Sequence, residues 1–197
     1  SSDGDNLRVL KNDDTYHILV AAAGTLEYFT STDGSTLSPV QFDGSESLSY
    51  NPVSRPAFAL NETDNETALS IVYLDTNGDL LYTDSSDFSS SVEIESGFST
   101  DIKDFGDYTR LMADSSGTLH LVYSIHTDGK VYYRRFDSQG ETWSEAEALE
   151  VGSGSDNSYI LGLDAALSDE STLLVSYISR ITDDDSPSTL NWVELDL

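Results

Sequence analysis

Three of the six arginines occupy related positions in the chain and form a candidate anion-binding clamp. Arg8 and Arg110 precede equivalent points of a sequence repeat, Thr15 and Gly117, by seven residues each, and Arg55 starts the corresponding segment between them. A planar guanidinium donates paired hydrogen bonds to a carboxylate, so the three side chains predict a site for an acidic ligand. The competing interpretation, favoured by the surplus of carboxylates, is that each arginine pairs with a nearby Asp or Glu.

A candidate calcium site lies in the segment 75–79, where Asp75, Asn77 and Asp79 present oxygen ligands at alternate positions. Calcium prefers six to eight oxygen ligands, and such a loop supplies several of them. The segment lacks the twelve-residue loop with a terminal Glu that defines an EF-hand. The alternative interpretation is an ordinary polar turn, in which Asp and Asn bond to their own backbone.

Several kinds of catalytic chemistry have no support in the sequence. The chain contains no cysteine, which excludes disulfides, thiolate zinc sites and a cysteine nucleophile. The three histidines, His17, His120 and His126, show no spacing typical of a metal pair or a catalytic triad. No Gly-x-Ser-x-Gly motif occurs either. We therefore assign no catalytic residue from the sequence, and the interpretation leans towards a protein that is not an enzyme.

The elements that must position these residues follow from a pattern that occurs four times. A Gly or Ser is followed two residues later by an apolar residue and after two more by an aromatic one, in segments 24–28, 78–82, 129–133 and 188–192. The aromatic residues are 54, 51 and 59 positions apart. A repeat of this length indicates one supersecondary unit used several times. The aromatic residues are Tyr28, Tyr82, Tyr133 and Trp192.

Each repeat predicts a small antiparallel sheet, because short apolar runs alternate with Gly, Asp, Asn and Ser turns. The predicted strands of the first copy are 7–10, 16–20 and 40–42. Their counterparts are 56–60, 69–73 and 92–94 in the second copy, 110–113, 119–123 and 145–149 in the third, and 160–163 and 173–177 in the fourth. One further strand is predicted around the aromatic residue of each copy. Four strands per repeat of about fifty residues are typical of a propeller blade.

We therefore predict an all-β fold, a β-propeller of about four four-stranded blades whose last blade lacks its outer strand. The 197 residues form a single domain, with blades at approximately 6–46, 54–97, 107–151 and 158–197. The four repeat aromatics are expected to pack between neighbouring blades. The alternative is an arc that closes only with a partner or with further sequence.

Segment 136–143, FDSQGETW, resembles the Asp-box, or bacterial neuraminidase repeat, of sialidase-like propellers. Gly140, Thr142 and Trp143 match, while Phe136 and Ser138 stand where that motif has Ser and Asp. The resemblance implies a propeller in which the motif is a structural turn on the rim. It also implies that the arginines of first strands line a central channel and grip a carboxylate. The Tyr nucleophile, Glu partner and Asp acid/base of that family have no recognisable motif here.

The net charge of −27, from 36 acidic and nine basic residues, limits the partners of this chain. Such a surface repels nucleic acid and anionic membranes, and no apolar stretch is long enough to insert into a bilayer. Many acidic residues and few lysines suit a halophilic or marine protein, because salt screens their self-repulsion. A start without Met predicts a removed leader, and hence an exported protein at the cell surface or outside the cell.

Three functions follow from these features. The first is a secreted, non-catalytic propeller that binds a glycan or a surface protein, with calcium as a candidate ion. The second is a sialidase-like glycoside hydrolase that acts on acidic sugars, with the arginines as its clamp. The third is a structural subunit that forms a homo-oligomer through the open edge of the fourth blade by strand addition.

Overall fold

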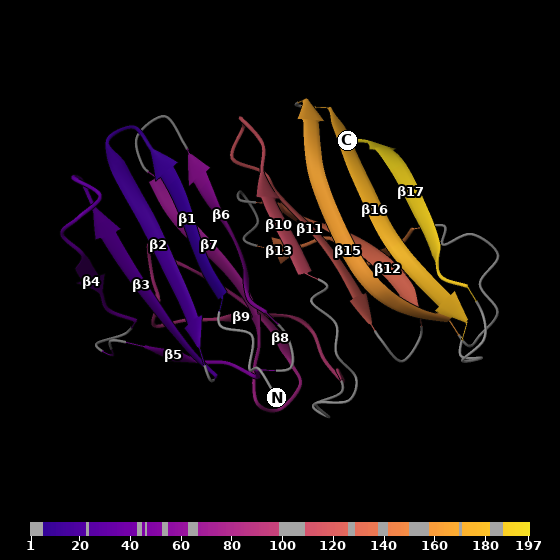
Figure 1. The fold of residues 1–197 in the computed structure, drawn as a ribbon, viewed down its shortest axis with the longest axis horizontal. Helices are drawn as coiled ribbons and strands as arrows, with labels where there is room; N and C mark the ends of the chain where they lie inside the picture. The colour runs from indigo at the N-terminus through magenta and orange to yellow at the C-terminus, as the bar shows by residue number, and fades with distance from the viewer. Residues whose placement is uncertain are drawn as a thin grey trace.

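The structure, a computed structural model, is built from seventeen β-strands and describes residues 6–22, 24–42, 45, 47–52, 55–62, 67–98, 109–125, 129–137, 142–149, 158–169, 171–181 and 187–197. The strands form four antiparallel sheets that follow one another along the chain (Figure 1). This confirms the all-β class and the division into four sheets. No helix in this described part of the chain has the length and apolar composition needed to cross a membrane.

The order of strands within each sheet follows their order in the sequence. Sheet 1 contains β1 (Asn6–Asn12), β2 (Thr15–Ala22), β3 (Thr25–Ser31), β4 (Ser38–Val40) and β5 (Leu48–Ser49). Sheet 2 contains β6 (Ala57–Glu62), β7 (Thr67–Leu74), β8 (Leu80–Asp84) and β9 (Val92–Glu95). Sheet 3 contains β10 (Thr109–Ala113), β11 (Leu119–Ile125), β12 (Lys130–Asp137), β13 (Thr142–Trp143) and β14 (Glu147–Ala148). Sheet 4 contains β15 (Ser158–Asp169), β16 (Thr172–Ile181) and β17 (Thr189–Asp196).

The prediction of four-stranded blades is wrong for sheets 1 and 3, each of which has five strands. In both, two short strands share the outer edge of the third strand. In sheet 1, β4 bonds to Tyr28–Thr30 of β3 and β5 to its first residues, Thr25 and Leu26. In sheet 3, β13 pairs with the end of β12 and β14 with its middle. The chain leaves the edge and returns to it, which satisfies more backbone groups than one short outer strand would.

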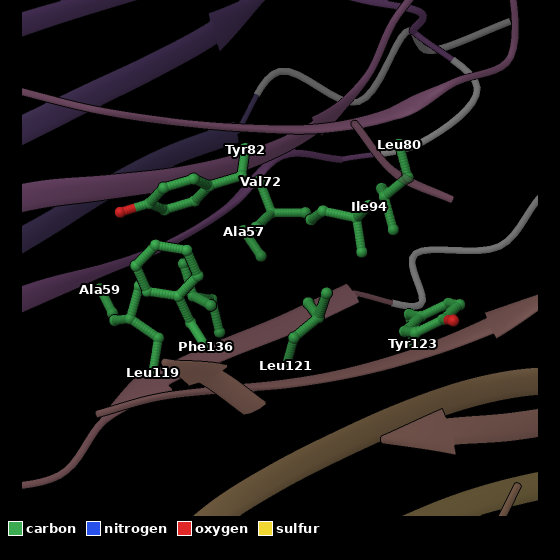
Figure 2. Packing of buried hydrophobic residues seen from close by; sticks show 11 residues of the cluster. Ala57, Ala59, Val72, Leu80, Tyr82, Ile94, Leu119, Leu121, Tyr123 and Phe136 are labelled. Carbon is green, nitrogen blue, oxygen red and sulfur yellow. The ribbon is translucent and has the colours of Figure 1, made fainter. Parts of the chain in front are cut away.

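Three core clusters hold the sheets together, and each lies between two consecutive sheets. Sheets 1 and 2 share one that includes Leu26, Tyr28 and Ile71, and sheets 3 and 4 share one that includes Val122 and Leu173. Between sheets 2 and 3, Val72 and Tyr82 face Leu121 and Phe136 (Figure 2). We call the face of a sheet that is directed towards the next sheet its forward face and the opposite one its backward face.

The repeat aromatics lie on forward faces, and the first three are anchored by a polar partner in the second strand of the same sheet. The hydroxyl of Tyr28 lies 2.7 Å from Nδ1 of His17, and that of Tyr133 lies 2.9 Å from Nδ1 of His120. In sheet 2, Ser70 Oγ lies 3.4 Å from the hydroxyl of Tyr82. His17 and His120 therefore have a structural role, because each bonds the hydroxyl of a tyrosine that packs towards the next sheet.

His17 gives the fold a measurable dependence on pH. Burial lowers its pKa from the ordinary value of 6.5, so the unfolded chain takes up a proton before the folded one does. Stability contributed by neutral His17 is therefore present above about pH 6.5 and is lost as the pH falls towards the folded pKa. Urea unfolding at pH 7.5 and 5.0 should show a larger loss for the native chain than for His17→Asn, and equal losses would contradict this role.

The fourth repeat aromatic departs from the prediction. Tyr28 and Tyr82 are 4% and 5% exposed, whereas Trp192 is 71% exposed. The prediction that Trp192 packs between blades is wrong, because no further sheet covers sheet 4 within the described residues. Sheet 1 and sheet 4 lie at opposite ends of the row of sheets (Figure 1). The described molecule is thus an open arc.

Candidate functional site

The arginines of the proposed anion clamp lie on or beside the first strands of successive sheets. Arg8 is in β1 and Arg110 in β10, as predicted, and Arg55 lies two residues before the start of β6. The guanidinium carbon of Arg8 lies 5.9 Å from the ring centroid of Phe58 in β6, a cation–π arrangement. The carbonyl of Arg55 accepts a 3.0 Å hydrogen bond from the hydroxyl of Thr109. These contacts run from one first strand to the next.

Arg110 forms an ion pair with Asp164 of β15, across the junction between sheets 3 and 4. Its Nε donates to a carboxylate oxygen of Asp164 at 2.9 Å, and its Nη1 donates to the carbonyl of Thr109, also at 2.9 Å. The register places Asp164 in sheet 4 at the position that Arg110 and Arg8 hold in their own sheets. An acidic ligand at Arg110 would have to displace this carboxylate. The clamp of Arg8, Arg55 and Arg110 stays a prediction.

The predicted calcium ligands lie in the tight turn between β7 and β8, where Gly78 has a φ of 90°. Oδ1 of Asp75 accepts hydrogen bonds from the backbone of Asn77 and Asp79 at 2.8 and 2.9 Å, and Oδ2 accepts one from the Asn77 amide. Desolvation opposes ionisation, but these hydrogen bonds outweigh it and hold the pKa of Asp75 below its usual value. No group of three His, Cys, Asp or Glu suited to a metal occurs among the described residues. Calcium binding stays a prediction.

The Asp-box segment is described only in part. Gly140 lies outside the described residues, while Thr142 and Trp143 form β13. The Trp143 ring packs 5.2 Å from Phe136 and 5.6 Å from Tyr82, measured between ring centroids, and so joins sheets 2 and 3. The corresponding turn of sheet 1 is self-bonded: Asp33 Oδ1 accepts from the backbone of Ser35 and Thr36. The described part of the motif is therefore structural.

One cluster has the residue types of a tyrosine nucleophile with an acidic partner. The hydroxyl of Tyr123 lies 3.2 Å from a carboxylate oxygen of Glu95 and accepts a hydrogen bond from Nε of Arg134 at 3.1 Å. Arg134 Nη2 also forms a short ion pair with Glu95. Tyr123 is fully buried, and burial raises its pKa to about 12. A buried phenol that holds its proton this strongly is unsuited to attack a substrate, so the cluster is a structural joint between sheets 2 and 3.

A groove of about 540 Å³ opens between sheets 3 and 4. Tyr133 and Arg135, two residues apart on β12, point to the same face, and β14 places Glu147 opposite Tyr133. The backbone of Arg135 is held by Ser144, whose hydroxyl accepts from the Arg135 amide at 3.0 Å. The remaining lining comes from residues next to β14 and from the end of β17: Glu145, Ala146, Leu195, Asp196 and Leu197.

The groove combines an aromatic ring, a cation and carboxylates. Tyr133 is half-buried and its pKa is raised, first by burial, with Arg135 opposing this and Glu147 adding to it. Within the described part of the chain the exposed guanidinium of Arg135 makes no hydrogen bond or ion pair. It therefore offers donors to a ligand, while Glu147 and Asp196 offer acceptors. A concave site with apolar walls and a few convergent polar groups is the usual form of a small-molecule site.

Sequence reasoning missed this groove, although a signal was present. The residues two positions after the repeat aromatics are Thr30, Asp84, Arg135 and Glu194. Only the third repeat has a cation there, in a chain with nine basic residues. That position lies on the same forward face as the aromatic, beside the next sheet. A comparison of the copies position by position would have singled out Arg135, whereas the clamp hypothesis considered only first strands.

No protein-family model matches the sequence, and no curated protein matches it significantly. The structure is similar to a lectin, SapL1, in complex with α-methyl fucoside (TM-score 0.60, 9% identity, 98% of this chain and 64% of that one). It is also similar to the polysaccharide lyase Uly1 (TM-score 0.57, 11% identity, 96% and 52%). A third similar structure is the fungal Aleuria aurantia lectin, a six-bladed β-propeller (TM-score 0.55, 15% identity, 98% and 61%).

These similarities show a propeller-type fold. The chain spans less than two thirds of the length of each of the three proteins. Its four sheets thus correspond to part of the similar structures. The sialidase type, which the sequence resemblance suggested, stays a prediction.

Proposed function

We propose that this chain is a non-catalytic β-propeller protein that binds a glycan in the groove between sheets 3 and 4. The groove carries the proposal, because Tyr133, Arg135 and Glu147 converge there and the guanidinium has no partner within the described residues. Two of the similar structures support it, since both are lectins and one holds α-methyl fucoside. Action outside the cell belongs to the same proposal and is supported by the net charge of −27.

The chemistry of the groove suits a hydroxyl-rich ligand. Tyr133 and Leu195 offer apolar surface to the C–H face of a sugar ring, and Arg135 donates to its hydroxyl oxygens. The carboxylates of Glu147 and Asp196 accept hydrogen bonds from sugar hydroxyls. Because these carboxylates lie beside the cation, a neutral sugar fits better than a strongly acidic one.

A glycoside hydrolase acting on acidic sugars has weaker support. Arg110, one of its three clamp residues, is paired with Asp164. In the Tyr123–Glu95 pair the phenol is fully buried, and burial raises the pKa of Tyr123 to about 12. The degenerate Asp-box remains part of the proposal as a structural turn, supported by the self-bonded turn at Asp33.

Arg135→Ala tests the proposed site. The native chain is titrated with α-methyl fucoside and with a panel of neutral and acidic monosaccharides, and binding is followed by calorimetry and ligand-observed NMR. For the sugars that bind, we expect the variant to weaken affinity by about tenfold or more, because a buried ligand loses a charge-assisted hydrogen bond. The titrations are run with calcium and with a chelator, which also tests the predicted ion.

Arg8→Ala is the matched control, because it removes the same charge from an exposed position in β1, the first strand of sheet 1. Affinity should stay unchanged in this variant. Loss of affinity in Arg8→Ala, together with full affinity in Arg135→Ala, would place the binding site at the first strands of the sheets and favour the arginine clamp. Absence of binding across the panel would contradict the glycan-binding proposal.

A further inference from the structure

The forward face of sheet 4 is apolar and uncovered. Leu190 and Trp192 of β17 are 73% and 71% exposed, and Leu174 and Ile178 of β16 are each 39% exposed. These residues alternate with Val175, Tyr177 and others that pack against sheet 3. Among the described residues, four large apolar side chains of the forward face thus lie uncovered beside Ser176 and Glu194, whereas the backward face is covered by sheet 3. A contiguous apolar face of this kind on a protein surface indicates an interaction site.

The repeats show what this face is built to contact. The register places Trp192 opposite Ser176 in sheet 4, as Tyr133 stands opposite Val122 in sheet 3. Leu174 lies two residues before Ser176, just as His120 lies two residues before Val122. Leu174 therefore holds in sheet 4 the position that His120 holds in sheet 3. In sheets 1 to 3 this position carries His17, Ser70 or His120 and bonds the tyrosine hydroxyl. Sheet 4 has replaced the polar pair by Leu and Trp, at the place where the other three sheets contact the next sheet. The forward face of sheet 4 therefore has apolar side chains at the same positions that the other three sheets use to contact the next sheet.

The backward face of sheet 1 is the matching half. In sheet 2, Phe58, Ile71 and Tyr73 pack back against sheet 1. Their register equivalents in sheet 1 are Val9, Ile18 and Val20, because Arg8 pairs with Leu19 as Ala57 pairs with Val72. Val9 is 53% exposed and its face neighbour Leu7 is 65% exposed. Ile18 and Val20 are half-buried, and no described sheet precedes sheet 1.

We propose that a second copy of this chain covers sheet 4 with its own sheet 1, and so repeats the junction that joins consecutive sheets within the chain. Each chain carries both halves, and the two lie at opposite ends of the arc (Figure 1). The contact is head-to-tail, so two or more copies close a ring or extend as a filament. This uses the face of sheet 4, whereas the sequence-based prediction used the open edge of β17.

Charge supports the choice of partner. The backward face of sheet 1 carries Lys11, one of three lysines, whose Nζ lies 5.6 Å from the ring centroid of Tyr16. The forward face of sheet 4 carries Glu194, two residues after Trp192. In a chain of net charge −27 most surfaces repel a second copy, so opposite charges on these two faces favour their contact over others.

Light scattering on the full chain tests this assembly over a range of protein concentrations at 0.1 and 1 M salt. High salt shortens the screening length to about 3 Å and weakens the repulsion between copies. We expect a mass above the 21.5 kDa of one chain, with tighter association at high salt. A chain that stays monomeric under all these conditions would overturn the proposal.

Face variants separate this contact from pairing at the edge. Leu190→Asp with Trp192→Asp blocks the sheet 4 face, and Leu7→Asp with Val9→Asp blocks the sheet 1 face. Each pair should raise the dissociation constant by about tenfold or more, since exposed apolar anchors carry most of an interface's energy. Leu37→Asp, at a 50% exposed residue of the turn before β4, is the control and should associate like the native chain. Face variants that associate normally would overturn the proposal and favour edge pairing.

Mixing the two face variants gives the sharpest test. Each lacks one half, so neither assembles alone, but the intact sheet 1 face of one fits the intact sheet 4 face of the other. We expect the mixture to form a dimer of one copy of each. A mixture that stays monomeric would show that the two faces are not partners. Circular dichroism of each variant checks that the substituted, exposed positions leave the fold intact.

Discussion

Replacing Tyr82 by alanine is expected to lower the free energy of unfolding by about 3–5 kcal/mol, the range typical of large aromatic residues in a core. Tyr82 is 5% exposed, and its ring centroid lies 5.0 Å from that of Phe136 and 5.6 Å from that of Trp143. Its hydroxyl also bonds to Asp84 at 3.0 Å. Urea denaturation followed by tryptophan fluorescence measures the loss, because Trp143 lies in the same junction.

Trp192→Ala is the matched control, at the same repeat position but 71% exposed. Measured at low salt and low protein concentration, where copies are apart, its effect should stay within about 0.5 kcal/mol. A large loss in this variant under those conditions would show that sheet 4 is covered within a single chain. A small loss in Tyr82→Ala would contradict the packing between sheets 2 and 3.

Removal of the Arg134 side chain is the second large expected effect. Arg134→Met should lower the free energy of unfolding by about 2–4 kcal/mol. This is near the lower end of the range for breaking a buried ion pair, because the Glu95 side chain is 30% exposed and stays partly hydrated. The loss leaves Glu95 without its cation and removes a donor to the Tyr123 hydroxyl. Equilibrium unfolding in urea gives the value.

A double-mutant cycle with Glu95→Gln isolates the pair. The double variant should lose less than the sum of the two single losses, because its two remaining groups are neutral and cost less to bury. Purely additive losses would show that Arg134 acts through packing and not through its charge. Arg135→Met, on the exposed neighbouring residue, serves as the control and should change stability little.

The repeated pattern predicts most of the fold because it depends on local rules. Alternation of apolar and polar residues sets the strands, and Gly78 and its counterparts, which have positive φ, set the turns between them. The paired outer strands of sheets 1 and 3 depend on how the chain returns to an edge after a loop. Such pairings as Leu26 with Leu48 join distant residues and leave no periodic signal.

The candidate site was less predictable than the fold. The groove needs Arg135 from sheet 3 and Asp196 from sheet 4, so its existence depends on how two sheets pack. The exposure of Trp192 likewise depends on a neighbour and not on its own repeat. Identical spacing told us that Tyr28, Tyr82, Tyr133 and Trp192 are equivalent in their sheets. It does not indicate that, within the described structure, only the first three are followed by another sheet.

The separation of the three core clusters has a consequence for how such a protein changes over evolutionary time. Among the described residues each core cluster joins one pair of consecutive sheets, as in a linear array with nearest-neighbour coupling. Duplication or deletion of one unit of about fifty residues would therefore leave the other junctions intact. The number of sheets can therefore change by whole repeats, and sheets 1 and 4 at the two ends are the positions where a repeat can be gained or lost without disturbing an existing junction.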